Sequence, residues 1–275
     1  MDYISYSQYK TYTSCPRSWY LSKIRKAEEK QTWYIPVGSA VHDMIEAKIR
    51  HDRKPGFVIN TSPEIKAEDY FYPLIERQLT IEPDTSKWLA GGPVERPVIE
   101  ERALQLVRDC FEKALEELEQ IDVWEVEYEA TGSLPSLSVP VKAYVDIIGE
   151  HKKSKRPVIL DWKSGSTKPD NFQLITYAAL LDTDKRKPAG GFDGRYVMLA
   201  PGKPKTRYVD LSGVKPAEVG KKYQEVYDQM QKKLYQTNAG FNCRFCFHQE
   251  NCLVNAGVTP RTTYYDRSAE DGLPF

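Results

Sequence analysis

Apolar residues in the first half of the chain recur at helical spacing. The stretch Glu101–Ile121 predicts a long amphipathic helix, whose apolar face consists of Leu104, Val107, Phe111, Leu115 and Leu118. A stripe with a spacing of four predicts a second helix over Pro36–Arg50 and consists of Val37, Val41, Ile45 and Ile49. Ser5 and Ser7 open a shorter helical pattern, with serine in a capping position. Residues 51–97 are rich in proline and glycine, and we expect an irregular, partly helical insertion there.

After residue 122 the period changes from that of a helix to that of a strand. Three apolar or alternating runs predict consecutive strands over Val123–Ala130, Val139–Glu150 and Pro157–Trp162. The remaining pattern predicts a helix, two strands and a last long helix, over Phe172–Leu181, Arg195–Ala200, Arg207–Leu211 and Lys215–Tyr235. Helices followed by a strand meander, and then by further helices and strands, predict an α/β core in which helices flank a mixed central sheet.

These patterns divide the chain into four parts. A helical N-terminal region (1–122) precedes the α/β core (123–236), and a cysteine-rich segment (237–258) is followed by a C-terminal tail (259–275). The chain has no run of about 18 apolar residues, which excludes a membrane span. Its first residues lack the apolar stretch of a secretory signal, and five cysteines are an odd number for a disulfide framework. We therefore expect a cytoplasmic protein.

Charge is segregated along a chain whose formal net charge is zero, with 39 basic and 39 acidic residues among 275. Residues 100–129 hold eleven acidic and three basic side chains, a balance of −8. Residues 151–168 hold six basic and one acidic, or +5, and residues 203–233 hold eight basic and four acidic, or +4. Most charge runs are solvated faces. Because the basic runs flank the strands that carry the candidate chemistry, the neutral total does not exclude a nucleic-acid partner.

Two carboxylates and a lysine lie on adjacent predicted strands. Asp146 belongs to the apolar run AYVDIIGE, and Asp161 and Lys163 follow the apolar residues of PVILDWKSG. Side chains two apart on a strand share a face, so Asp161 and Lys163 point together while Trp162 points away. If the strands form a hairpin, Asp146 lies alongside Asp161, and the two carboxylates can hold Mg²⁺ or Mn²⁺. With the lysine this set suits phosphodiester hydrolysis, and the alternative is an ordinary surface strand with an Asp–Lys pair.

Other side chains flank this constellation. His42, in the run GSAVH beside the apolar stripe of the predicted Pro36–Arg50 helix, is either a metal ligand or a structural histidine. Gln173 and Tyr177 lie four apart on one helix face, where they can bond to substrate or to the lysine, or pack against the sheet. Glu127, on the preceding strand, is a further carboxylate, with a surface role as the alternative.

Three cysteines cluster near the C-terminal end, and Cys243, Cys246 and Cys252 follow a C-x₂-C-x₅-C spacing. Three thiols leave a four-thiolate site one ligand short. Cys110 has helical spacing with apolar neighbours, which indicates a small core residue, so Cys15 is the better fourth ligand. Four cysteines suit either zinc or an iron–sulfur cluster, and the neighbouring His248 keeps a mixed zinc site open.

Taken in order, these motifs resemble the RecB-like branch of the PD-(D/E)XK nucleases. They are S-x-S-x₄-Y and Cys-Pro near the start, then G-S-A-V-H, V-D-I-I, L-D-W-K-S-G, Q-L-x-x-Y and C-x₂-C-x₅-C. Within that branch the chain is similar to the iron–sulfur exonucleases, which include the CRISPR-adaptation nuclease, the AddB nuclease domain and phage-encoded relatives. The resemblance covers roughly residues 1–50 and 120–255, and the ordered set is far more specific than any single motif.

The resemblance implies a restriction-endonuclease-like core and a role for each matching residue. It implies that Mg²⁺ or Mn²⁺ is held by His42, Asp146 and Asp161. It implies that Lys163 is the catalytic lysine, and that Gln173 and Tyr177 complete the site. It also implies that a [4Fe–4S] cluster is held by Cys15, Cys243, Cys246 and Cys252. Two features depart from the relatives: Asp161 stands where many have glutamate, and the region 51–120 is longer than in the small members.

We therefore predict a metal-dependent DNA exonuclease, acting on single strands in recombination, repair or replication, within a bacterium or a phage-infected cell. The basic residues of 152–168 and 203–233 would follow the strand by phosphate contact and stacking. Two alternatives stay open: a non-catalytic module that binds single-stranded DNA, and the same nuclease with zinc in place of the cluster. The tail residues Glu270–Phe275 resemble the acidic, Pro-Phe-ending tail of bacterial single-stranded-DNA-binding proteins, which favours a protein partner, with a disordered tail as the alternative.

Overall fold

A mixed sheet lies at the centre of the molecule. The computed structural model describes residues 2–53, 64–89, 96–165, 169–183, 188, 190–202 and 206–252. The sheet is built from β1 (Ile4–Ser5), β2 (Ile121–Gly132), β3 (Val141–His151), β4 (Pro157–Lys163), β5 (Asp193–Met198) and β6 (Thr206–Asp210). The order along the sheet is β1-β3-β4-β5-β6, and β2 pairs with β3. Parallel pairing of β4 with β5, beside antiparallel pairs on either side, makes the predicted mixed sheet.

Strand β3 has different neighbours along its length. On one edge it pairs with β2 over its whole span. On the other edge, β1 pairs in parallel with its first residues, at Val141 and Lys142, and β4 pairs antiparallel with Ile147 to Glu150. The residues between these two pairings, which include Asp146, therefore lie where the β3 and β4 strands begin to separate.

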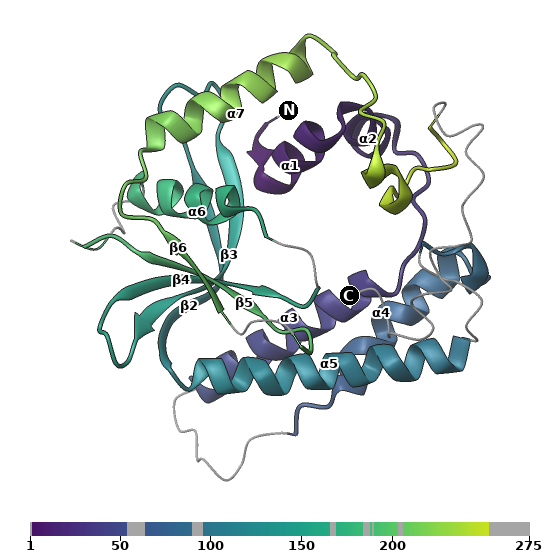
Figure 1. Ribbon diagram of the computed structural model, residues 1–275, viewed down its shortest axis with the longest axis horizontal. Coiled ribbons are helices and arrows are strands. Elements are labelled where there is room, and N and C mark those ends of the chain that lie inside the picture. The colour runs from purple at the N-terminus through teal and green to yellow at the C-terminus, as the bar shows by residue number, and fades with distance from the viewer. Residues whose placement is uncertain are drawn as a thin grey trace.

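Helices cover both faces of the sheet, and each face has its own apolar core (Figure 1). One core packs α1 (Tyr6–Ser14), α6 (Asn171–Thr183) and α7 (Pro216–Gln231) against the sheet. The other packs α3 (Tyr34–Asp52), α4 (Ala67–Ile81) and α5 (Arg96–Leu118) against the opposite face. Buried β-strand side chains alternate between the two cores, as Ile159 faces the first and Leu160 the second.

Most predicted elements are present, with shifted ends. The predicted helices over Pro36–Arg50 and Glu101–Ile121 correspond to α3 and α5, and all five predicted strands form. The insertion is more regular than we expected, because α4 is a 15-residue amphipathic helix within it, despite an internal Pro73. Its apolar positions, such as Phe71 and Ile75, are fully buried against the second core.

The N-terminal segment continues past α1 through α2 (Pro16–Tyr20) and the π-helical turn η1 (Leu21–Arg25). This segment lies beside the short 3₁₀ helix η4 (Phe241–Phe245) near the other end of the described chain (Figure 1). Backbone hydrogen bonds join the residues around them, from Arg17 N–H in α2 to the Gln236 carbonyl before η4, and from Lys30 N–H after η1 to the Phe247 carbonyl after η4. None of the helices in the described ranges is both long and apolar enough to cross a membrane.

Candidate metal centre and cysteine pocket

The two aspartates meet where β3 and β4 separate. The pairing of Ile147 with Leu160 places Asp146 and Asp161 next to each other at the end of the hairpin, as predicted. Both are buried, with 7% and 1% of their surface exposed. Asp146 Oδ2 accepts a 2.8 Å hydrogen bond from the backbone N–H of Trp162, so the side chain itself bridges the two strands. Trp162 packs into the opposite core, as the strand periodicity predicts.

A chain of polar contacts runs from Asp161 to α6. The Lys163 ammonium forms an ion pair with Asp161 and donates a 3.1 Å hydrogen bond to Gln173 Oε1. The Gln173 amide donates in turn to the Tyr177 hydroxyl at 2.8 Å. Burial raises the pKa of Tyr177 well above its usual range, and Asp161 and Asp146 raise it further, so the phenol stays protonated. The predicted spacing of four between Gln173 and Tyr177 therefore produces a chain of hydrogen bonds, and this chain orients the Lys163 side chain.

His42 completes a group of possible metal ligands with a residue from β2. His42 Nδ1 lies 3.7 Å from Asp146 Oδ2 and 3.5 Å from Glu127 Oε1. One ligand atom from each of His42, Glu127 and Asp146 lies within 4.8 Å of the other two, and no other group of three in the described residues meets this distance. Asp161 is therefore beside this group rather than within it. Glu127, whose role the sequence left open, is placed in the site.

The backbone of Glu127 explains its position. Its φ is +47°, a left-handed value that non-glycine residues seldom adopt, within the long strand β2. Paired residues on either side keep the β2–β3 register, since Val126 lies opposite Ile147 and Tyr128 opposite Val145. The irregularity is therefore confined to the residue whose carboxylate reaches His42. Strained backbone of this kind persists where the surrounding structure determines it, and is found often at functional sites.

The charges in the group shift one another. Burial alone would lower the pKa of His42, but the carboxylates of Asp146, Glu127 and Asp161 outweigh burial and raise it to about 9. Burial and the Asp161 carboxylate raise the pKa of Asp146 to about 7. When no metal is bound, the protonated His42 side chain therefore neutralises part of the negative charge of the carboxylates. A bound divalent cation would neutralise that charge instead.

The donor set fits a hard divalent cation. Two or three carboxylates and an imidazole are oxygen and nitrogen ligands of the kind that Mg²⁺ and Mn²⁺ accept. The buried Oδ2 of Asp161 contacts the Lys163 ammonium but accepts no hydrogen bond from the described part of the chain. In the metal-free protein the Lys163 ammonium therefore balances the charge of this carboxylate.

A second cluster is formed by the cysteines. Cys15, at the junction of α1 and α2, shares one pocket with the three cysteines of the C-terminal segment. The pocket is lined by Cys15, Ser18, Leu21, Thr237, Asn238, Ala239, Cys243, Cys246 and Cys252. All four thiols are free and partly exposed. The backbone N–H of Gly240 donates a hydrogen bond to Cys243 Sγ at 3.4 Å. The predicted choice of Cys15 as the fourth thiol agrees with this arrangement.

Two other residues that the sequence offers as metal ligands, Cys110 and His248, have different surroundings. Cys110 is fully buried in α5, and burial raises its pKa to about 12, as suits an inert core thiol. His248 is also buried, with its Nδ1 3.4 Å from the Glu28 carbonyl and its Nε2 3.4 Å from Glu29 Oε1. Both ring nitrogens therefore face acceptors of the loop before α3. This geometry disfavours the mixed zinc site that the sequence left open.

The basic runs predicted to follow DNA are partly neutralised. In the turn between β3 and β4, Lys155 pairs with Asp122 and Glu150, and Arg156 pairs with Asp193. This turn lies at the far end of β3 from Asp146, five residues along the strand. Residues 166–168 and 203–205 lie outside the described ranges, as do residues 253–275 with the predicted Glu270–Phe275 tail.

The family of the chain follows from its sequence as well as from this geometry. Comparison with protein families matches residues 3–253 to the PD-(D/E)XK nuclease superfamily, and the chain belongs to that superfamily. A comparison with curated protein sequences finds no match. The mixed sheet flanked by helices fits the restriction-endonuclease-like fold. Membership implies a nuclease that acts on DNA with a divalent metal ion, and the His42, Glu127 and Asp146 group is suited to hold one.

Proposed function

We propose that the protein is a metal-dependent DNA exonuclease of the RecB-like iron–sulfur branch, with single-stranded DNA as its preferred substrate. The observation that carries the proposal is the convergence of His42, Glu127 and Asp146 beside the Asp161–Lys163 pair. Helix α3 and the three consecutive strands β2, β3 and β4 bring these side chains to one place. Mg²⁺ or Mn²⁺ would be held by His42, Asp146 and Asp161, with Glu127 as an additional carboxylate.

The chemistry divides between the metal and the protein. When bound, the cation supplies a nucleophilic water at neutral pH and stabilises charge on the phosphate. Lys163 carries a positive charge at a fixed position, because Gln173 and Tyr177 orient it from α6. In that position it stabilises the negative charge that develops on the phosphate oxygens. Asp146 and Asp161 are held by the hairpin, so the reacting groups need little rearrangement.

We also propose that the cysteine pocket holds a [4Fe–4S] cluster. A tetrahedral zinc site, with Zn–S bonds of about 2.3 Å, needs its sulfurs about 3.8 Å apart. Among the described residues, no three cysteine sulfurs lie within 4.8 Å of one another. This wider spacing, and the engagement of His248 elsewhere, favour a larger cluster over a single zinc ion. Anaerobically prepared protein should be brown, with broad absorption near ~400 nm, whereas a colourless zinc-containing protein would refute the cluster.

Digestion of blocked strands tests the proposed activity. End-labelled single strands, blocked at the 5′ end, at the 3′ end or at both, are incubated with Mn²⁺ beside a circular single strand. An exonuclease degrades the strands with a free end of the correct polarity and leaves the circle intact. Cleavage of the circle would show an endonuclease. Binding to every strand with cleavage of none would show a non-catalytic DNA-binding module.

A further inference from the structure

The N-terminal segment is a long stretch of the described chain that carries basic side chains and no acidic ones. Residues 6–26, which form α1, α2 and η1, contain five basic side chains and no acidic one. We call this segment the basic arm, and its cations are Lys10, Arg17, Lys23, Arg25 and Lys26. Within the described ranges, none of the five forms an ion pair, although Arg17 lies over the Tyr20 ring at 5.1 Å. Four of them are exposed and Arg17 is half-buried.

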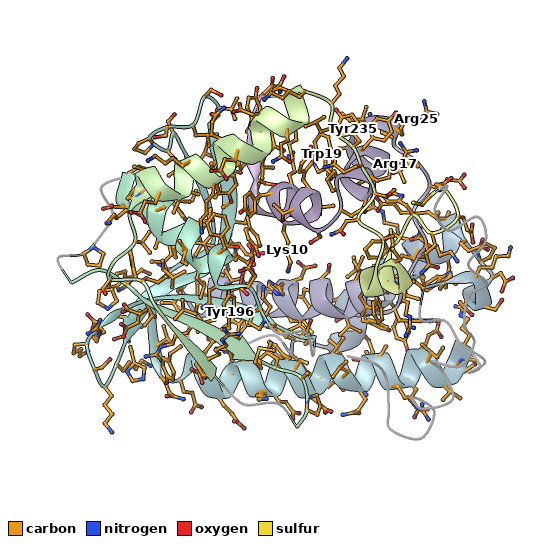
Figure 2. All side chains as sticks on the ribbon, turned by 45° about the horizontal axis from the view of Figure 1, so that its top comes forward. Lys10, Arg17, Trp19, Arg25, Tyr196 and Tyr235 are labelled. Atoms are coloured by element: carbon orange, nitrogen blue, oxygen red, sulfur yellow. The ribbon has the colours of Figure 1, made fainter. Side chains whose placement is uncertain are left out.

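The arm begins at the candidate metal centre. Tyr6, at the start of α1, donates a 3.2 Å hydrogen bond to Asp170, just before the helix that carries Gln173. Tyr196 donates to the Asp170 carbonyl, and its ring lies 5.5 Å from the Lys163 ammonium. Lys10 is one helical turn beyond Tyr6, on the same side of α1. Figure 2 shows Lys10 pointing from α1 toward α3, the helix of His42.

The arm ends at the cysteine pocket. Cys15, Ser18 and Leu21 of the arm line that pocket together with the C-terminal cysteines. At the opposite end, β1 joins the arm to the sheet by pairing with β3. Arg17 lies over the ring of Tyr20, which stacks on Tyr235, and Figure 2 shows Arg17 and Tyr235 well away from Lys10. The cations are therefore spread along a path whose two ends are fixed to the rest of the fold.

Aromatic rings accompany the distal cations. Tyr20 stacks on Tyr235 with ring centroids 4.6 Å apart, and Trp19 stacks on Tyr235 at 5.9 Å. Both tyrosines are partly exposed. Cations that contact phosphates, beside aromatic rings on which unpaired bases stack, are the usual features of surfaces that bind single strands. On the other side of the sheet, the acidic residues 100–118 lie on α5, where they repel a polyanion (Figure 1).

We propose that the basic arm binds the backbone of a single DNA strand and leads it to the candidate metal centre. This inference rests on the proposed nuclease function and replaces the basic turn 152–156, whose Lys155 and Arg156 are ion-paired, as the principal phosphate contact. The unpaired charge of the arm is available to a phosphate without first breaking an internal pair.

Two charge-matched variants test the proposal. The arm variant is K10Q/K23Q/R25Q/K26Q, and the turn variant is K152Q/K153Q/K155Q/R156Q. Each removes four exposed positive charges, and both are made in the Asp161→Ala chain, so that binding is read without cleavage. Fluorescence anisotropy gives the Kd for a labelled dT₂₀ strand at several salt concentrations, and circular dichroism checks folding. Lys10→Gln and Lys153→Gln repeat the comparison with minimal change if a fourfold variant is unfolded.

The expected result is a selective loss in the arm variant. Its Kd should rise by about tenfold or more at 100 mM salt, and the slope of log K against log salt should fall by up to about 2.8, which is ~0.7 for each lost phosphate contact. The turn variant should stay within about threefold of its parent. Equal weakening of both variants, weakening of the turn variant alone, or unchanged binding in both would overturn the proposal. So would a 20-bp duplex that competes as well as the single strand.

This binding test is independent of the proposed activity. If wild-type protein fails to cleave DNA, the nuclease proposal fails while the binding comparison still reports on the arm. If wild-type protein cleaves and the arm variant binds as tightly as its parent, the arm proposal alone fails.

Discussion

The two candidate metal sites of this protein are assembled in different ways. His42, Glu127 and Asp146 come from a helix and two paired strands, and their ligand atoms already lie within 4.8 Å of one another. The cysteines of the pocket come from distant parts of the chain, and no three of their sulfurs lie within 4.8 Å of one another in the described residues. The first site is therefore supported by the sheet whether or not a cation is bound. The second joins the N-terminal segment to the C-terminal cysteine segment, which hydrogen bonds and stacked rings also connect, and we expect its bound group to add to the stability of that junction.

The largest expected effect separates chemistry from metal binding at the first site. Lys163→Met removes a positive charge that Gln173 orients, so single-turnover cleavage should fall by about 10²–10³-fold, as for other lost electrostatic contacts. Mn²⁺ binding, measured by calorimetry, should be retained because the ligands remain. The exposed Lys153→Met is the matched control and should cleave at the wild-type rate. Undiminished cleavage by Lys163→Met would remove the lysine from the mechanism.

The second effect tests the cysteine pocket as a structural site. Cys15→Ser should abolish the absorption near ~400 nm and lower the Tm by about 5–10 °C, given ~2–4 °C per kcal/mol for a chain of this size. Cys110→Ala is the control, since Cys110 is buried in α5 and should leave the absorption unchanged. A Cys15→Ser protein with full absorption would place the fourth ligand elsewhere.

The third effect concerns Glu127, the β2 residue with a left-handed backbone conformation. Glu127→Gln keeps the size of the side chain and removes its charge, so the Kd for Mn²⁺ should rise by about 10–100-fold, the range for partners that support metal ligands. Glu125→Gln, on the same strand, should change the Kd by less than about threefold. If both variants bind Mn²⁺ like the wild type, Glu127 does not act on the metal.

The smallest effect is a pH dependence of metal binding at the first site. The raised pKa values, about 7 for Asp146 and about 9 for His42, mean that both groups bind protons more tightly than usual in the metal-free protein. A cation must displace these protons, so Mn²⁺ affinity should increase from pH 6 to pH 9. Calorimetric titrations at pH 6.5, 7.5 and 8.5 check the trend, and an affinity that decreases with pH would contradict it.

The sequence predicts the parts of the site that follow from periodicity. Strand alternation places Asp161 with Lys163, and helical spacing places Gln173 with Tyr177, and both pairs are in contact. Glu127 could not be assigned in the same way, because its direction depends on a left-handed backbone conformation within a strand. Cys15 follows from the exclusion of Cys110 and from the family resemblance, and its contact with the C-terminal segment does not follow from a local pattern.

Charge counts along the sequence take no account of the ion pairs that the fold creates. A run such as 152–156 is conspicuous because its cations are consecutive, but strand pairing brings carboxylates from neighbouring strands beside it. The cations of the basic arm are spread over 21 residues and three short helices, so no window of the sequence emphasises them. Only the fold shows that they form no ion pair with the described residues.

Cleavage by Asp161→Ala tests the central claim most directly. Wild-type and Asp161→Ala proteins are freed of metal, and each is given Mn²⁺ and an end-labelled single strand, with binding measured in parallel. We predict that wild type degrades the strand only when Mn²⁺ is present, and that Asp161→Ala binds the strand with similar affinity without degrading it. Full activity in Asp161→Ala, or wild-type cleavage without a divalent metal, would contradict the account.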